Sequence, residues 1–254
     1  MPLFEYDQIV SLNERELHVC NYVTSHTAQV EKMSIRQLAD ATGVSTTTIF
    51  RFCSKVGCEG FQELKYKLKR YRERLPVNNW HIPQDSAQVL QFLPGLEVNT
   101  EMQRHLQEAA EACAKAKNII CMGVGSGICL AEYGARYFAN LRLPAFAISD
   151  PFYPKPVRDM TGEVLIALSV SGETEQIIYQ ANDYRAMGAT VISITNAPTC
   201  RLAALSDINI NYYMPVFYAP QNMGPHNLTT QLPVIYLLET LARQAASLVG
   251  TQDE

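Results

Sequence analysis

The sequence has little of what membrane, secreted or metal-binding proteins carry. None of its apolar runs is long enough to span a bilayer. The amino terminus lacks the basic flank and apolar stretch of a signal peptide. The seven cysteines form an odd, irregularly spaced set, and the close pair Cys53 and Cys58 has no second pair or histidine at ligand spacing. We therefore expect a cytoplasmic protein with free thiols, no metal site and no contact with a membrane.

Strong charge is also missing, although the charges that are present are unevenly placed. The formal net charge is −4 over 254 residues, so the chain as a whole is not a polyanion binder. Residues 1–75 hold 11 Lys and Arg against 9 Asp and Glu, whereas the other 179 residues hold 10 against 16. Apolar residues make up 47% of the chain, which is ample for the core of one large domain or two smaller ones.

Three short helices are predicted near the amino terminus, over residues 12–23, 34–42 and 46–56. Asn13 and Glu16 have the spacing of a capping box at the start of the first helix. The segment Gly43-Val44-Ser45 forms a tight turn between the other two helices, and Ser45 is placed to cap the third. Two short helices joined by a glycine-containing turn indicate a helix-turn-helix. The alternative is a plain three-helix packing module with solvated charges.

The third predicted helix has the side chains that a recognition helix needs. Its amino end would enter the major groove, and it offers small hydrogen-bonding groups and one long cation: Thr46, Thr47, Thr48 and Arg51. Residues 51–74 hold eight cations against three glutamates, a composition that suits contacts with phosphates. We expect Ser45 to Thr48 and Arg51 to lie at double-stranded operator DNA, with Lys55 and Lys65 on its phosphates.

Residues 76–99 differ in character from the segments on either side. Pro76, Pro83, Pro94 and the single tryptophan, Trp80, interrupt any helical period. We interpret this segment as a linker. It divides the chain into an all-α helix-turn-helix domain, residues 1–75, and a second domain, residues 100–254.

The second domain alternates apolar strands with helices. Strands are predicted at residues 118–122, 145–148, 164–168, 189–195 and 208–212, and helices at residues 100–117, 128–141, 175–186 and 228–249, with Pro233 near the start of the last helix. This order is typical of an α/β doubly wound parallel sheet. Ligands of such sheets bind outside the carboxyl ends of the strands.

Two loops at those strand ends have the composition of a phosphate site. Ser169, Ser171, Gly172 and Thr174 follow a buried strand and precede a helix, where hydroxyls and unpaired N–H groups favour a dianion. The loop contains no Lys or Arg. Ordinary helix capping is the simpler interpretation of these residues. The second loop, Gly123 to Gly127, follows another strand, and its spacing to Asp150 fits a dinucleotide fingerprint poorly.

The first of these loops resembles the phosphosugar loop of sugar isomerase (SIS) domains. The motif S-x-S-G-E-T stands where aminosugar synthases of that superfamily have S-Q-S-G-E-T, with Val170 replacing the glutamine. The resemblance implies that Ser169, Ser171 and Thr174 hold a sugar phosphate, with Gly172 in the same loop. It also assigns Gly123, Gly125 and Ser126 to the sugar through the segment G-x-G-S, and His226, just before the last helix, as a further polar contact.

The amino-terminal region resembles RpiR-type bacterial regulators. The matching segments are MSIRQLADATGVSTTTIFRF and KVGCEGFQELK, and members of this family join such a domain to a SIS domain in the same order. The resemblance implies a sugar-controlled transcriptional repressor of carbohydrate metabolism genes. It would act as a homo-oligomer, a dimer or tetramer, whose effector is a sugar phosphate and which needs no cofactor.

The alternative is a phosphosugar isomerase, which needs a base that moves a proton between adjacent carbons. Glu132 and His226 are the candidates near the two loops, and neither has a spacing that identifies it as a base. Aminosugar isomerases also use a lysine from the chain end, which the tail TQDE does not supply. Because an isomerase has no use for a DNA-binding domain, we predict a regulator with no catalytic residues.

Overall fold

The structure is a computed structural model that describes residues 3–4, 8–9, 11–73, 100–197, 199–214, 216 and 227–250. The chain divides into two compact units, which are described separately. One comprises residues 1–95 and 214–230, and the other residues 96–213 and 231–254. The predicted linker, Trp80 and His226 lie outside the described residues, and the domain limits at residues 75 and 100 stay a prediction.

Short helices build the amino-terminal unit: α2 (Glu14–Ser25), α3 (Thr27–Val30), α4 (Ile35–Thr42), α5 (Thr46–Lys55) and α6 (Phe61–Glu73). Capping chemistry sets their starts. Asn13 and Glu16 form the predicted capping box on α2, Ser34 and Gln37 form another on α4, and Ser45 caps α5. Gly43 ends α4 with a φ of 62°, a conformation that glycine adopts without steric cost.

Apolar side chains from several of these helices share one core. Val19, Leu38, Phe52, Leu64 and Leu68 are fully buried. Helical spacing predicts an inner face of Ile35, Leu38 and Ala39 on α4 and of Ile49, Phe52 and Cys53 on α5. All of these residues are buried except Ile35, which is half-buried. Helix α6 was not predicted, although its buried residues Phe61, Leu64 and Leu68 have the spacing of one helix face.

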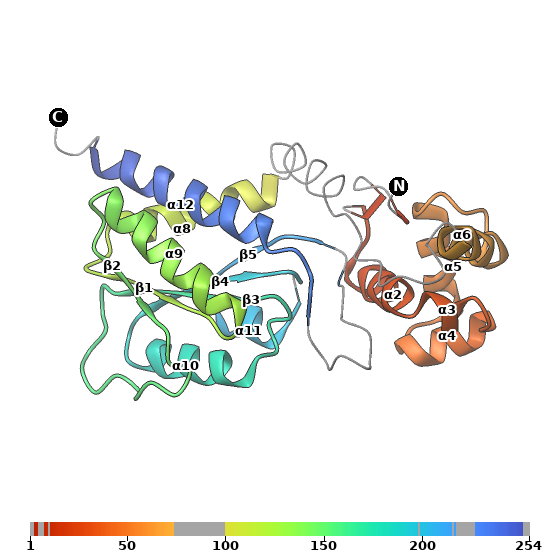
Figure 1. The fold of residues 1–254 in the computed structure, drawn as a ribbon, viewed down its shortest axis with the longest axis horizontal. Helices are drawn as coiled ribbons and strands as arrows, with labels where there is room; N and C mark the ends of the chain where they lie inside the picture. Colours follow the sequence, from red (N-terminus) through yellow and green to blue (C-terminus); the bar gives the residue numbers. More distant parts are fainter. Residues whose placement is uncertain are drawn as a thin grey trace. The chain divides into compact units, whose positions relative to one another are not determined.

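A five-stranded parallel sheet forms the centre of the carboxy-terminal unit. Its strands are β1 (Ile119–Met122), β2 (Ala145–Ile148), β3 (Val164–Ser169), β4 (Thr190–Thr195) and β5 (Ile208–Asn211), in the spatial order β2-β1-β3-β4-β5. The helices are α8 (Thr100–Ala114), α9 (Ser126–Asn140), α10 (Glu175–Ala186), α11 (Arg201–Leu205) and α12 (Leu232–Gly250). Helices α8, α9 and α12 lie on one face of the sheet, and α10 and α11 lie on the other (Figure 1). The predicted doubly wound fold is confirmed.

Burial on both faces explains why the strand sequences are so apolar. Every residue of β1 and β3 is buried. Ile120, Met122, Leu165 and Ala167 pack with α10 through residues such as Ile177. The alternate strand residues face the opposite layer of helices.

The start of helix α12 differs from its predicted position. Helix α12 begins at Leu232, four residues later than predicted, with Pro233 in its first turn, where a missing N–H costs nothing. The connection from β2 to β3 contains no helix, since Pro151, Pro154 and Pro156 remove the N–H groups that a helix would use.

The seven cysteines are free thiols, and burial raises the pKa of Cys53 and Cys121 to about 12. No helix in the described ranges is both long and apolar enough to cross a bilayer.

Candidate ligand site and nucleic-acid interface

The two predicted ligand loops lie side by side because β1 and β3 are neighbours. These strands pair in parallel, with Met122 opposite Ala167, so their carboxyl ends lie at the same edge. The chain continues from β1 to β2 on one side and then returns to β3 on the other side. The topological switch point of the sheet therefore lies between β1 and β3. The fold therefore brings Gly123 to Ser126 next to the segment from Ser169 to Thr174.

Hydroxyl groups organise the loop after β3. Ser169 Oγ accepts a hydrogen bond from the Gly172 amide at 3.1 Å and lies 3.0 Å from Thr174 Oγ1. Ser171 Oγ accepts from the Glu173 amide at 3.2 Å. Because the bond from the Glu173 amide uses the oxygen of Ser171 as an acceptor, the hydroxyl hydrogen of Ser171 is available to a ligand. The Ser169 and Thr174 hydroxyls share one hydrogen between them and leave the other to donate.

The helices that follow the two loops begin without side-chain caps. Helix α10 starts after Thr174 and α9 starts after Gly125, and neither residue makes a side-chain capping bond. Helices normally satisfy some of their first N–H groups in this way. Two uncapped helix starts at one sheet edge, together with the hydroxyl hydrogens, form an arrangement of donors that favours an anion.

Two glycines allow the backbone to approach closely at this edge. A Cβ on Gly123 would lie 2.3 Å from the carbonyl oxygen of Gly127. Gly172 has a φ of +65°, and a Cβ there would lie 2.0 Å from Cys200 Sγ. The glycine at each position is therefore required by space, and at Gly172 also by backbone conformation.

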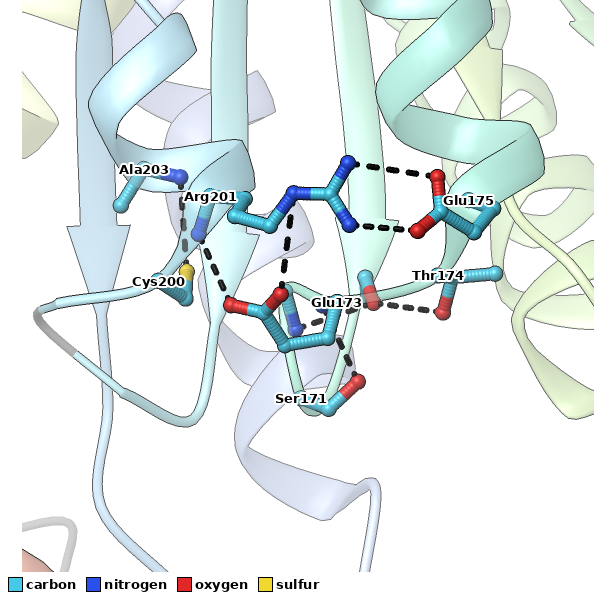
Figure 2. Close-up of polar contacts among 9 residues, drawn as sticks. Ser171, Glu173, Thr174, Glu175, Cys200, Arg201 and Ala203 are labelled. Atoms are coloured by element: carbon cyan, nitrogen blue, oxygen red, sulfur yellow. Dashed lines mark hydrogen bonds and ion pairs between the residues drawn. The ribbon is translucent and has the colours of Figure 1, made fainter.

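Arg201 and two glutamates form the charged part of this site, as Figure 2 shows. The Arg201 guanidinium pairs with both carboxylate oxygens of Glu175, and its Nε lies 4.0 Å from Glu173 Oε2. The Arg201 backbone amide also donates to Glu173 Oε1 at 2.9 Å. Hydrogen bonding and charge from Arg201 lower the pKa of Glu175, and the same contacts raise the pKa of Arg201.

The structure brings most of the predicted ligand residues to one edge of the sheet. Gly123, Gly125 and Ser126 come from the β1 loop, and Ser169, Ser171, Gly172 and Thr174 from the β3 loop. His226 lies outside the described residues. The sequence analysis missed Cys200 and Arg201, which follow β4 about thirty residues later, because no spacing rule connects them to the loop. The alternative base, Glu132, is exposed on α9.

The predicted DNA contacts lie along the exposed side of α5. Thr47 and Arg51 are exposed and one helical turn apart, while Ile49, Phe52 and Cys53 fix the opposite side in the core. Ser45 and Thr48 are joined at the helix start, with Thr48 N donating to Ser45 Oγ at 3.2 Å. Phe50, which was not predicted, is also exposed, at 53%.

Lysines beside this helix have contacts that the sequence did not predict. Lys55 Nζ lies 2.7 Å from Glu16 Oε2 and 2.7 Å from the Ser11 carbonyl oxygen, and Glu16 is only 1% exposed. Lys67 Nζ donates to the carbonyl of Val56, the residue that ends α5, at 3.0 Å. Lys65 Nζ lies over the Phe61 ring at 5.8 Å. Phosphate contacts by Lys55 and Lys65 stay a prediction, and Lys55 in addition has a structural contact.

Comparisons with known proteins identify a known type of domain in each of the two units. A model of the rpiR-family helix-turn-helix domain matches residues 7–74, and a model of the SIS domain matches residues 113–238. The chain is 28% identical over 215 residues to the uncharacterized HTH-type transcriptional regulator TTE0211 of Caldanaerobacter subterraneus, which covers 79% of this chain and 75% of that protein. It is 27% identical over 208 residues to the HTH-type transcriptional regulator GlvR of Bacillus subtilis, covering 78% of each.

Solved structures show the same fold. The Vibrio vulnificus NanR protein complexed with ManNAc-6P matches 96% of this chain and 90% of its own, with a TM-score of 0.58 at 20% identity. The sugar isomerase domain of an RpiR transcription factor from Sphaerobacter thermophilus matches 66% of this chain and 91% of its own, with a TM-score of 0.53 at 13% identity. At such identities the likeness concerns the fold alone.

Proposed function

The chain is a transcriptional regulator of the RpiR family that joins a helix-turn-helix domain to a SIS domain, and from this we propose that it represses carbohydrate metabolism genes until a phosphorylated sugar binds. The observation that carries the proposal is the pair of loops at the β1–β3 switch point. The β1 loop is rich in glycine and the β3 loop is rich in hydroxyl groups, and both lead into helices without a side-chain cap. This arrangement suits the phosphate of a phosphosugar better than a neutral sugar.

In the proposed complex, α5 is the recognition helix. Thr46, Thr47 and Arg51 approach base edges in the major groove, since they lie on the amino-terminal half or the exposed side of this helix. Lys65 contacts phosphates. One helix-turn-helix covers few base pairs, so the protein acts as a homo-oligomer on an operator with two-fold symmetry.

The proposal includes no isomerase turnover. The curated relatives TTE0211 and GlvR are regulators, which supports a protein that is not an enzyme.

The test combines operator binding with an effector screen. Operators are selected from random duplexes with the purified full chain, and the bound complex is then titrated with matched pairs of sugars and sugar phosphates. We expect a phosphosugar to weaken operator binding and its unphosphorylated partner to have no effect. Equal effects of the two members of every pair would contradict the proposed site.

A second arm of this experiment tests the recognition helix. Arg51→Ala should relax base preference by about 1–3 kcal/mol, whereas Lys65→Ala should weaken binding to all sequences alike. Unchanged operator preference in Arg51→Ala would show that α5 is not the helix that reads the bases.

A further inference from the structure

Arg201 is a cation placed beside a loop that has none of its own. From Ser169 to Glu175 the only charged side chains are Glu173 and Glu175, and both are acidic. Both carboxylates contact Arg201. Glu173 accepts a hydrogen bond from the Arg201 amide and lies 4.0 Å from its Nε, and Glu175 accepts from the guanidinium. Figure 2 shows this ion pair alongside Ser171 and Thr174, whose hydroxyls belong to the anion site.

We propose that Arg201 is a positioning residue for phosphate binding, which holds the Glu173 and Glu175 carboxylates away from the donors of the anion site. This inference rests on the proposed binding of a phosphosugar at the same loop. Arg201 is not placed as a ligand of the phosphate, because its guanidinium is already bonded to Glu175 and paired at 4.0 Å with Glu173. Its role is to prevent the loop's own negative charges from opposing an incoming dianion.

The need for such a residue follows from where the two glutamates lie. Glu173 lies inside the loop, and Glu175 is the first residue of α10, whose starting N–H groups have no side-chain cap. A carboxylate is itself a good partner for a helix start, so an unrestrained glutamate could occupy the donors that a phosphate needs. With Arg201 bonded to Glu175, that carboxylate points toward α11 instead.

The backbone of the loop is fixed separately from its charge. The Leu202 amide donates to the Gly172 carbonyl at 3.0 Å, the Asn196 amide donates to the Val170 carbonyl at 3.0 Å, and Cys200 packs against Gly172. Replacing the Arg201 side chain removes none of these contacts and also leaves the Arg201 amide in place. A side-chain variant therefore changes the charge near the loop while the backbone anchors remain.

Coulomb's law gives the size of the expected effect. One unit charge about 7 Å from a dianion in a water-like dielectric changes the affinity on the order of fivefold, and added salt reduces the change. The Arg201 side chain is exposed, so we do not expect a larger effect on phosphate affinity. Phosphate takes up a proton and becomes a monoanion as the pH falls, whereas sulfate stays a dianion. Titration with sulfate therefore separates the effect of protein charge from the effect of ligand protonation.

The experiment titrates the full chain with inorganic phosphate at pH 8, following the amide signals of the β3 loop by NMR. Arg201→Gln is compared with the wild type, with the triple variant Glu173→Gln, Glu175→Gln, Arg201→Gln, and with Arg185→Gln. The last is a matched control, because Arg185 forms an exposed ion pair with Asp207 at the other end of α10. Melting temperatures and the same titration with sulfate are recorded for each variant.

We expect Arg201→Gln to bind phosphate and sulfate about fivefold more weakly at low salt, with a smaller loss in high salt. The triple variant should recover at least wild-type affinity, because it removes two negative charges and one positive charge, and Arg185→Gln should not differ from the wild type. Wild-type affinity in a folded Arg201→Gln protein would overturn the inference, as would a triple variant that stays weak. Absence of phosphate binding by the wild type would instead overturn the proposed function, and this inference with it.

Discussion

Among individual residues, Lys55 shows how a surface cation can be part of the fold. Its ammonium group bridges the buried Glu16 carboxylate and the Ser11 carbonyl, and Glu16 also forms the capping box of α2. The end of α5 is thereby tied to the start of α2. From sequence, Lys55 is indistinguishable from the other cations of residues 51–74, because nothing in the local pattern indicates a partner 39 residues earlier.

We predict that Lys55→Ala lowers the unfolding free energy of the amino-terminal unit by about 1–2 kcal/mol, because Glu16 would lose a partner for its buried charge. Lys65→Ala is the matched control and should change stability by less than about 0.5 kcal/mol. Denaturant unfolding of the two variants checks this. If both changed stability equally, the contact with Glu16 would have no particular role.

Ser171 has a hydroxyl hydrogen that its bond with the Glu173 amide leaves available. Ser171→Ala should therefore weaken phosphosugar binding by about 1–3 kcal/mol, through the loss of a donor to a charged acceptor. Calorimetric titration with the phosphosugar from the effector screen measures this change. Ser126→Ala provides a comparison at the other loop, and undiminished affinity in Ser171→Ala would remove this hydroxyl from the site.

At the level of helices and strands, the close approach of the β3 loop to α11 depends on glycine. Gly172→Ala should lower the stability of the carboxy-terminal unit by about 2–5 kcal/mol. This range combines the positive φ, which costs an alanine about 1–2 kcal/mol, with overpacking against Cys200, which costs about 1–3 kcal/mol.

Gly125→Ala is the control for this prediction. Gly125 also has a positive φ, of 61°, but a Cβ there would meet nothing within 4 Å. Only the cost of the backbone conformation should remain, about 1–3 kcal/mol, because φ 61° and ψ −125° are a combination that side chains other than glycine rarely adopt. Thermal or denaturant unfolding compares the two variants, and equal losses would show that the Cys200 contact yields without cost.

Elements with a clear period were predictable, and their arrangement was only partly so. The bounds of α10 and β2 agree with the prediction, because each has an uninterrupted apolar pattern between clear breaks. Alternation of strands and helices implied the parallel sheet and the edge where ligands bind. It did not specify the strand order, so the contact between the two loops was inferred only from the general rule. Arg201 and Cys200 reach the site through that order, which no local pattern records.

For the whole molecule, the proposed function requires that sugar and operator affect each other. We expect the phosphosugar to weaken operator binding about 5- to 150-fold, which corresponds to a coupling of about 1–3 kcal/mol. Linkage then requires operator DNA to weaken phosphosugar binding by the same factor. Phosphosugar titrations with and without saturating operator test this, with a scrambled duplex as control. Identical sugar affinities in the two titrations would exclude allosteric control.

The contacts that shape the β3 loop also determine when this loop can fold during protein synthesis. Ribosomes make chains from the amino terminus, and parts of a chain fold as their partners become available. Helices α2 to α6 are complete in sequence once residue 73 has been added, whereas the β3 loop needs Cys200 and Leu202 to hold Gly172. The proposed effector site is therefore among the last parts of the protein to form. A nascent chain would have its proposed recognition helix well before it could respond to an effector.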